Sequence, residues 1–375
     1  MKPQLTRSPS KAASMFLGTQ EKCTTCSKTV YPIEKGESTS SDNGDQPQRP
    51  PKVPRIEEEE QQVESMKPPK PGLQRYLVAF EYIGTHFSGS QQQRDQRTAV
   101  GVLQNAFQKF VGQPVSIFGS SRTDAGVHAL SNVCHVDVER TSKRKPGEVL
   151  QPHEPSVVRR AVNHFLQKEG DIMVIDVRSV PSDFHARYKA QERTYYYRLL
   201  SGQESLSTFE RDRAWHVPEE LNLQTMQEAC KVLVGHHDFS SFRAAGCQAK
   251  SPIRTLDELH VTESVSVPYF PSFVEREQCN ISVQDSPNNN GEELTESCQQ
   301  FGIRRGHRCL VVKARSRSFL YHQVRLLVGV LKCVGTGQIT VADVKCILNA
   351  RSVTAASPMA PACGLYLGHV KYDFN

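Results

Sequence analysis

A short run of small and polar residues between two expected strands carries the side chains best suited to chemistry in this 375-residue chain. The run reads Gly-Ser-Ser-Arg-Thr-Asp-Ala-Gly-Val-His over residues 119–128. Loops between strands often hold catalytic groups, and a lone carboxylate such as Asp124 among small residues could approach a substrate without obstruction. Gly126 permits a backbone conformation that is closed to other residues. An ordinary turn has a similar composition, so these residues by themselves leave both interpretations open.

An aromatic stretch is the second candidate. Arg193 opens the run Arg-Thr-Tyr-Tyr-Tyr-Arg, and strand alternation places Tyr195 and Tyr197 on one sheet face, with Tyr196 and Arg198 on the other. Tyrosines beside arginines can bind a nucleobase through stacking and cation–π contacts. Packing of the tyrosines in a sheet core is the alternative that this pattern leaves open.

A positively charged region lies near the C-terminus. Residues 297–341 contain eight Lys or Arg and no Asp or Glu. That balance favours a polyanionic partner, although a solvated basic helix is also compatible with it. Arg325 falls inside an apolar, helix-like run, so we expect it to be partly buried. Since a buried arginine normally has a carboxylate partner, Asp124 is the natural candidate.

The elements that must position these residues alternate between strands and helices. Alternating patterns predict strands at 75–83, 115–118, 133–139, 172–177, 193–200 and 365–372. Spacings of three and four predict helices at 100–110, 157–165 and 222–233. Interleaved strands and helices indicate an α/β or α+β fold, for which a sheet flanked by helices is the economical architecture.

Composition excludes some classes of protein. The 46 Lys and Arg against 40 Asp and Glu give a net charge of +6, and 37% of the residues are apolar. No stretch approaches the ~18 uninterrupted apolar residues that cross a bilayer, because the best candidate contains His322, Arg325 and Lys332. The 11 cysteines have irregular spacings, which do not predict a disulfide framework. We expect reduced thiols in the cytosol, the nucleus or the mitochondrial matrix.

Two segments do not fit the pattern of a packed core. Residues 1–73 hold 10 of the 22 prolines, which predicts a disordered leader. Within it, Cys23 and Cys26 resemble an incomplete LIM-like fragment at 21–35, too few ligands for structural zinc. Residues 263–306 predict a mobile inserted loop.

The rest of the chain is expected to divide into subdomains at 74–200 and 201–375. The first 20 residues carry three basic and no acidic side chains. This composition is compatible with mitochondrial targeting, with the cytoplasm or nucleus as alternatives.

Four segments together resemble the TruA family of tRNA pseudouridine synthases, over residues 75–372. They are the signature Arg-Thr-Asp-Ala-Gly-Val-His within 119–129 and the segments 184–197, 318–329 and 360–367. Supporting blocks at 82–89, 237–243 and 251–254 follow in the family's order. The chain departs from the pattern at Gly89-Ser90-Gln91-Gln92-Gln93, where the family usually has Gly-Trp-Gln-x-Gln.

The resemblance implies a mixed, largely antiparallel sheet flanked by helices, with two similar subdomains around a basic RNA-binding cleft. It implies conversion of uridine to pseudouridine in tRNA, by extruding the base, breaking its N-glycosidic bond and rejoining it through carbon. Such an isomerisation consumes nothing, so no cofactor and no metal are expected. Bacterial members suggest a homodimer. A non-catalytic RNA-binding protein or chaperone using the same cleft is the alternative.

By the family pattern the site centres on three residues. Asp124 would be the essential carboxylate, acting as nucleophile or removing a ribose proton. Tyr195 would stack on uracil, with proton handling as a second role, and Arg325 would pair with Asp124. Arg122 would fill the gap that the flipped nucleotide leaves. Further RNA contacts are expected from the neighbouring side chains of Thr123, His128, Arg187, Arg193, Arg315, Arg317 and His322.

Overall fold

The computed structural model describes residues 72–142, 144–145, 147–264, 306–356 and 358–374. Apart from their ends, the predicted leader (residues 1–73, with the Cys23 and Cys26 pair) and the predicted loop at 263–306 lie outside these residues. Within the described ranges, no helix has the length and apolar character that crossing a bilayer requires.

The described residues form ten strands and five α-helices. The strands are β1 (Leu73–Tyr82), β2 (Ile117–Gly119), β3 (His128–Glu139), β4 (Ile172–Val180), β5 (Ala190–Ser201), β6 (Trp215–Val217), β7 (Gly235–Asp238), β8 (Ile253–Ser264), β9 (Arg308–Ser316) and β10 (Leu365–Tyr372). The helices are α2 (Ala99–Val111), α3 (Pro155–Leu166), α4 (Leu223–Leu233), α6 (Gln323–Gly335) and α7 (Val341–Ala350), with short 3₁₀ turns η1 (Gly84–His86), η2 (Ser240–Phe242) and η3 (Ala362–Gly364).

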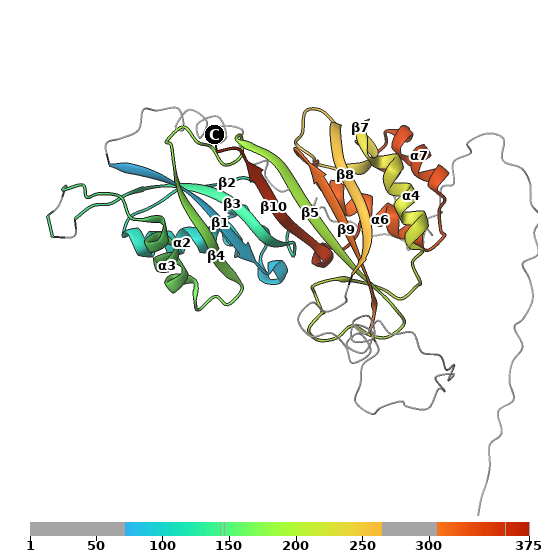
Figure 1. The fold of residues 1–375 in the computed structure, drawn as a ribbon, viewed down its shortest axis with the longest axis horizontal. Helices are drawn as coiled ribbons and strands as arrows, with labels where there is room; N and C mark the ends of the chain where they lie inside the picture. Colours follow the sequence, from blue (N-terminus) through green and yellow to red (C-terminus); the bar gives the residue numbers. More distant parts are fainter. Residues whose placement is uncertain (1–71, 143, 146, 265–305, 357, 375) are drawn as a thin grey trace, which may run out of the picture. The chain divides into compact units, whose positions relative to one another are not determined.

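All ten strands belong to one sheet, with the order β4-β1-β3-β10-β5-β9-β8-β7 and with β2 and β6 paired to β3 and β5 (Figure 1). Most neighbours are antiparallel, and the parallel pairs are β10 with β3 and β5 with β6. The last strand, β10, lies between β3 and β5. The C-terminal strand therefore joins the strands β4, β1 and β3 to the strands β5, β9, β8 and β7. The prediction of a mixed, largely antiparallel sheet flanked by helices is confirmed.

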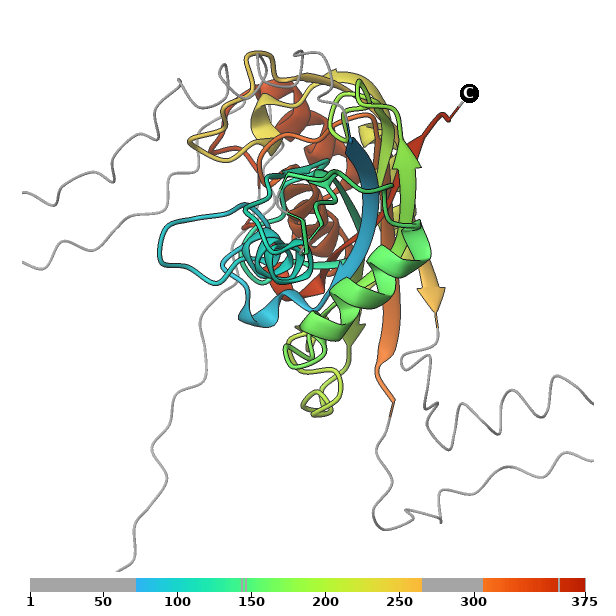
Figure 2. The same cartoon turned by 90° about the vertical axis from the view of Figure 1, so that its left-hand side faces the viewer.

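The two faces of the sheet differ. Helix α2 and the C-terminal helices lie to one side of the strands (Figure 2), and Tyr197, Leu310 and Val312 are buried on the face toward them. On the opposite face Lys313 and Arg315 are only half-buried. Any site built on the covered face must therefore lie where the helices leave the strands accessible.

The helices begin and end where capping residues stand. Thr98 caps α2 by accepting from the Gly101 N–H, and Gly112 ends this helix in the left-handed conformation at φ 80°. Asn222 caps α4 in the same way as Thr98 caps α2. Thr340 and Asp343 form a reciprocal capping box on α7.

The predicted strands and helices agree with the structure, but the list of strands was incomplete. Strands β6, β7, β8 and β9 and helix α7 were not predicted, although the alternating burial of β8 and β9 is the pattern on which the other strands were predicted. β3 begins at His128, inside the segment that was predicted to be a loop. The proposed subdomain boundary at residue 200 falls at the end of β5, a strand of the continuous sheet, and the division stays a prediction.

Candidate active site

Buried hydrogen bonds hold the loop that carries Asp124 in place. Ser90 N–H donates to the Thr123 carbonyl at 3.0 Å, and Ser90 Oγ accepts from Thr123 N–H at 2.8 Å. The Thr123 hydroxyl bonds Tyr82 Oη at 2.7 Å, and Asn132 donates to the same Oη at 3.2 Å. A side chain at Gly89 would place its Cβ 2.9 Å from the Thr123 carbonyl. This close approach explains why glycine precedes Ser90.

Asp124 faces two cationic or polar partners from the start of one helix. Its Oδ2 lies 3.4 Å from an Arg325 guanidinium nitrogen and 3.3 Å from His322 Nε2. The side chains of Asp124 and Arg325 are 24% and 12% exposed, so the pair is largely buried and the carboxylate is the more accessible partner. Arg325 Nε also donates to the Ala360 carbonyl at 2.8 Å. The residues that were expected to form this pair, 201 positions apart, are therefore in contact.

His322 stands at an unusual backbone position. It is the N-cap of α6 and has φ 62°, in the left-handed region, which costs a non-glycine residue free energy. Its ring stacks on Tyr321 with centroids 3.7 Å apart. Burial lowers the pKa of His322, and the Asp124 charge opposes that shift. The imidazole is therefore neutral near pH 7 and can offer one N–H.

Tyr195 lies on the covered face of β5 and is 8% exposed. Its ring meets Phe319 edge to face at 5.2 Å. Burial raises the pKa of Tyr195 well above the usual value, Arg193 opposes this rise, and Asp124 adds to it. Tyr195 is thus a neutral phenol. Tyr197 is fully buried and donates to the Pro361 carbonyl at 2.8 Å, so the core interpretation holds for this second tyrosine.

Three residues that were expected to contact RNA make side-chain contacts within the protein. Thr123 is buried against Tyr82. His128 is 2% exposed, and its Nδ1 accepts from the Gly84 N–H at 3.0 Å, which places the proton on Nε2, near the Asp212 and Cys363 carbonyls. Sequence alone could not distinguish these polar side chains from ligands.

Arg315 is the third of these residues. Its guanidinium lies 3.1 Å from carboxylate oxygens of both Glu192 and Glu258. Lys313 also pairs with Glu258, and Lys371 pairs with Glu192. The strip that carries no acid in the sequence thus receives acidic partners from β5 and β8. Arg315 thus belongs to an ion-pair network, and its contact with RNA stays a prediction.

The remaining expected residues lie around the Asp124 loop. Arg122 is exposed, and one of its nitrogens is 3.3 Å from Gln248 Oε1. Arg193 is bonded to the loop itself, as described below. Sequence reasoning missed Phe319 and Ala360 as contact residues. Both fall in segments that carried the family resemblance, which was the available signal.

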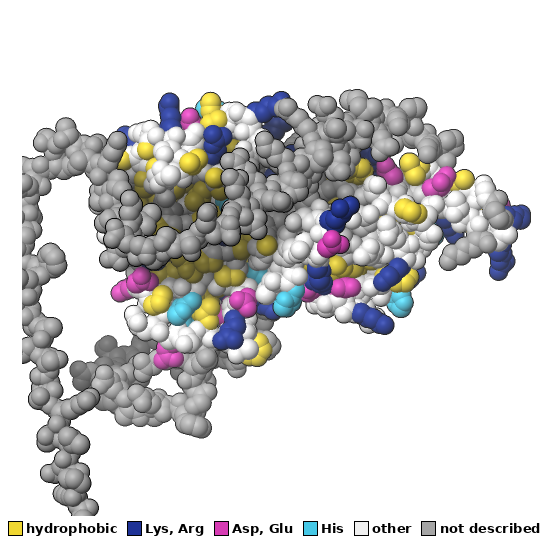
Figure 3. Space-filling model, turned by 180° about the vertical axis from the view of Figure 1, so that it is seen from behind, with side chains coloured by type: hydrophobic (Ala, Val, Ile, Leu, Met, Phe, Trp, Pro, Cys, Tyr) yellow, Lys and Arg dark blue, Asp and Glu magenta, His cyan; other side chains and the backbone are white. Residues whose placement is uncertain are grey.

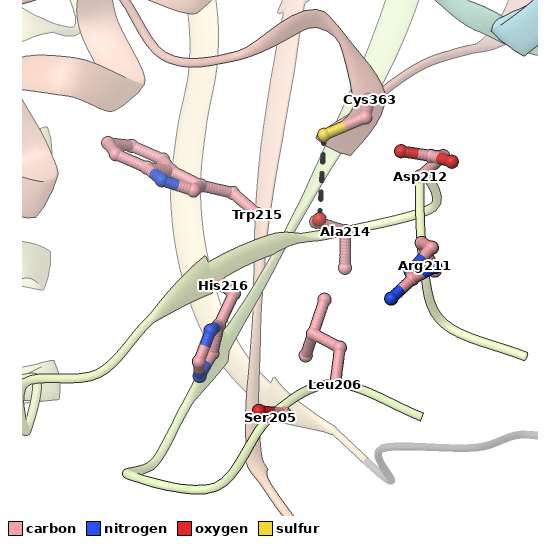
Figure 4. Close-up of a pocket in the computed structure, with 8 residues that line it drawn as sticks. All are labelled: Ser205, Leu206, Arg211, Asp212, Ala214, Trp215, His216 and Cys363. Carbon is pink, nitrogen blue, oxygen red and sulfur yellow. Dashed lines mark hydrogen bonds between the residues drawn. The ribbon is translucent and has the colours of Figure 1, made fainter. Parts of the chain in front are cut away.

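A hollow of about 330 Å³ lies elsewhere, between the β5–β6 loop, β6 and η3 (Figure 4). In it the Cys363 thiol donates to the Ala214 carbonyl at 3.5 Å. None of the expected site residues lines this hollow. His128 touches its rim through the Asp212 and Cys363 carbonyls. The hollow is therefore separate from the Asp124 constellation.

Comparisons with known proteins agree with the geometry. A sequence profile of the family described as "tRNA pseudouridine synthase" matches residues 78–189 and 229–373. A protein named tRNA pseudouridine synthase A from Xanthobacter autotrophicus is 38% identical over 300 residues, covering 80% of this chain and all of the relative. Proteins of the same name from Paramagnetospirillum magneticum and Rhodospirillum centenum are each 37% identical, covering 80% of this chain and 96% and 100% of the relatives.

The family match includes the Asp124 loop and the start of α6, the two segments whose side chains meet at the carboxylate. The chain belongs to the TruA family of tRNA pseudouridine synthases, which are isomerases.

Proposed function

We propose that this chain isomerises uridine to pseudouridine in tRNA and that Asp124 is the essential catalytic group. The observation that carries the proposal is the position of the Asp124 carboxylate. It lies on a loop of small residues, within 3.4 Å of Arg325 and His322. The names of the bacterial relatives support tRNA as the substrate.

The reaction exchanges one glycosidic bond for another. The bond from ribose C1′ to uracil N1 breaks, a bond from C1′ to C5 forms, the C5 proton leaves and N1 gains a proton. Asp124 serves either as the nucleophile at C1′ or as the base that removes a ribose proton, and the contacts of its Oδ2 are compatible with both. Because burial raises the pKa of Tyr195, this residue stays a neutral phenol that offers a stacking surface and an O–H hydrogen-bond donor.

Access to the stacked base requires extrusion from the RNA, which costs a few kcal/mol of stacking. We infer that Arg122 occupies the vacated position, supported by its exposure next to Asp124. The stacked pair of Tyr321 and His322 offers an aromatic surface beside the site, and Tyr321 is 46% exposed. Aromatic stacking of this kind contributes about 1–3 kcal/mol per base.

Finer assignments rest on the sequence. Ser120-Ser121 and the run Ala129-Leu130-Ser131-Asn132 support a place beside the animal tRNA pseudouridine synthase-like 1 branch of the family. The basic first 20 residues support a mitochondrial location, and likeness to bacterial members supports a homodimer. Microscopy of the tagged full-length chain and light scattering of the purified chain test the last two assignments.

The decisive test of the function is Asp124→Asn. Unmodified tRNA transcripts carrying tritium at uracil C5 release it when pseudouridine forms, since C5 loses its hydrogen. We expect the variant to release no tritium above background, with tRNA affinity within about twofold of wild type, because the amide keeps the shape and removes only the carboxylate. Tritium release by the variant would refute the assigned role. Wild-type binding of tRNA without release would instead favour the non-catalytic RNA-binding alternative.

A further inference from the structure

Arg193 makes an unusual set of hydrogen bonds beside the catalytic loop. Its Nε donates to Ser121 Oγ at 3.1 Å, and one terminal nitrogen donates to the Arg317 carbonyl at 2.6 Å. The other terminal nitrogen donates to the Ser120 carbonyl at 3.0 Å and to the Arg187 carbonyl at 3.2 Å. One guanidinium thus joins three chain segments that are far apart in sequence.

These three segments surround the proposed site. Ser120 and Ser121 begin the loop that carries Asp124, residue 187 precedes β5, and residue 317 follows β9. The sheet supports this arrangement, because Arg193 on β5 is paired with Ser316 on β9. Losing the guanidinium would therefore release the loop from both neighbouring strands at once.

Among the described residues no carboxylate bonds or pairs with this cation, whose contacts are carbonyls and one hydroxyl. Burial lowers the pKa of Arg193, the neighbouring tyrosines Tyr195 and Tyr372 oppose this shift, and the charges of Arg187 and Arg317 add to it. A cation held in this way without a counter-ion carries a desolvation cost. An anionic ligand would offset that cost.

The two neighbouring arginines are available for such a ligand. Arg187 and Arg317 are exposed, and in the part of the chain that the structure describes their guanidinium groups make no hydrogen bond or ion pair. Arg193 holds the backbone of both. On the face seen in Figure 3 the basic side chains are interspersed with acidic ones. A group of three arginines with no acidic partner of their own is thus a distinct local feature.

We propose that Arg193 is a positioning residue that clamps the Asp124 loop and holds Arg187 and Arg317 as a two-pronged site for a phosphate of the RNA strand near the reacting uridine. The proposal rests on the proposed function. Arginine suits this role because its planar fork supplies five donors in fixed directions, whereas lysine supplies a point charge on a flexible stem. A lysine at 193 keeps the charge and cannot reach three segments together.

The clamp is tested with Arg193→Lys, against Arg198→Lys as the matched control. Arg198 lies on the same strand but pairs with Glu210 on the opposite face. We expect Arg193→Lys to lower the single-turnover rate at saturating enzyme about 10- to 100-fold, with a smaller change in tRNA affinity. Arg198→Lys should leave the rate within about threefold of wild type. If both variants have equal rates at equal thermal stability, the clamp is refuted.

A second, smaller substitution tests the clamp in case Arg193→Lys fails to fold. Ser121→Ala removes one acceptor of the clamp and leaves the charge and the backbone carbonyls. We expect a rate lower by about 3- to 10-fold, since one hydrogen bond to a charged group is lost, and an unchanged melting temperature would separate positioning from stability. A wild-type rate for Ser121→Ala, together with a lower rate for Arg193→Lys that follows its lower stability, would overturn the positioning role.

The phosphate site is tested with Arg187→Gln and Arg317→Gln. The affinity for an unmodified tRNA transcript is measured at several salt concentrations. In a plot of log affinity against log salt concentration, each variant should reduce the magnitude of the slope by up to about 0.9. Arg351→Gln, exposed and 3.8 Å from Asp238, is the control for loss of one surface charge. Slopes equal to that control would refute the phosphate site.

Asp124→Asn is assayed in parallel with the clamp variants. If Asp124→Asn is inactive while Arg193→Lys is fully active, the clamp fails and the proposed function stands. If Asp124→Asn is active, the proposed function itself fails.

Discussion

Replacing Arg325 by Met removes the guanidinium that Asp124 contacts while keeping a long apolar side chain in α6. Arg325 contributes two bonds, one to Asp124 Oδ2 at 3.4 Å and one to the Ala360 carbonyl at 2.8 Å. The variant leaves the carboxylate with His322 alone on that oxygen. It also leaves the Ala360 carbonyl without this donor. The change should therefore affect both stability and the rate of the chemical step.

The size of the effect follows from the distance and the exposure. Two unit charges 3.4 Å apart attract by roughly 5 kcal/mol at an effective dielectric constant of 20. Solvent reaches Asp124, which is 24% exposed, so the net value is smaller. A hydrogen bond between charged groups contributes about 1.5–3 kcal/mol. At 1.36 kcal/mol per factor of ten, this predicts a rate lower by roughly 10- to 150-fold.

The assay combines kinetics with a double-mutant cycle. Single-turnover tritium release is measured at saturating enzyme for wild type and Arg325→Met. Urea unfolding is measured for wild type, Arg325→Met, Asp124→Asn and the double variant, and we expect a coupling free energy of about 1.5–3 kcal/mol. Arg325→Lys keeps the charge but not both hydrogen bonds, so its rate should lie between the rates of wild type and Arg325→Met. A coupling below about 0.5 kcal/mol, or a rate for Arg325→Met within about threefold of wild type, would refute the reasoning.

Two further predictions concern histidines. His322→Gln should keep a single-turnover rate within about threefold of wild type, because the Gln amide can reach Asp124 Oδ2. In His322→Asn the shorter side chain cannot reach this oxygen, so the rate should fall about tenfold, although Asn tolerates the left-handed backbone. Equal single-turnover rates for the two variants would contradict this prediction. For buried His135 the pKa is lowered from 6.5 to about 3, chiefly by burial. Between these values the unfolded chain binds the extra proton, so stability falls as pH falls, by up to about 1.4 kcal/mol per unit. Urea midpoints at pH 7 and pH 4 should therefore shift less in His135→Gln, and identical shifts in the two proteins would be the contrary result.

The candidate site could be predicted in part because its chemistry is concentrated in short segments. Asp124 and Gly126 lie within one loop, and the apolar surroundings of Arg325 indicated that its charge needs a carboxylate. The pairing of the two was therefore expected and is found. The partner set of Arg193 was not predicted, since it consists of backbone carbonyls, which every residue has.

The fold could be predicted where the two faces of an element differ clearly. α2 and β10 follow their patterns closely. The sheet order could not be derived in this way, because the position of β10 between β3 and β5 is set by contacts between distant segments. Arg315 shows the same limit. Its strip has no acid in the sequence, and its acidic partners come from strands that only the folded sheet brings beside it.

The sequence by itself determined the residue types, the alternation of elements and the family, because these depend on local order along the chain. Only the tertiary structure decided which polar side chains are bonded within the protein and which stay exposed. Thr123, His128 and Arg315 are bonded within the protein, while Arg187 and Arg317 are exposed. The physical reason is that availability depends on which groups lie within hydrogen-bonding distance, and folding places those groups from segments far apart in the chain.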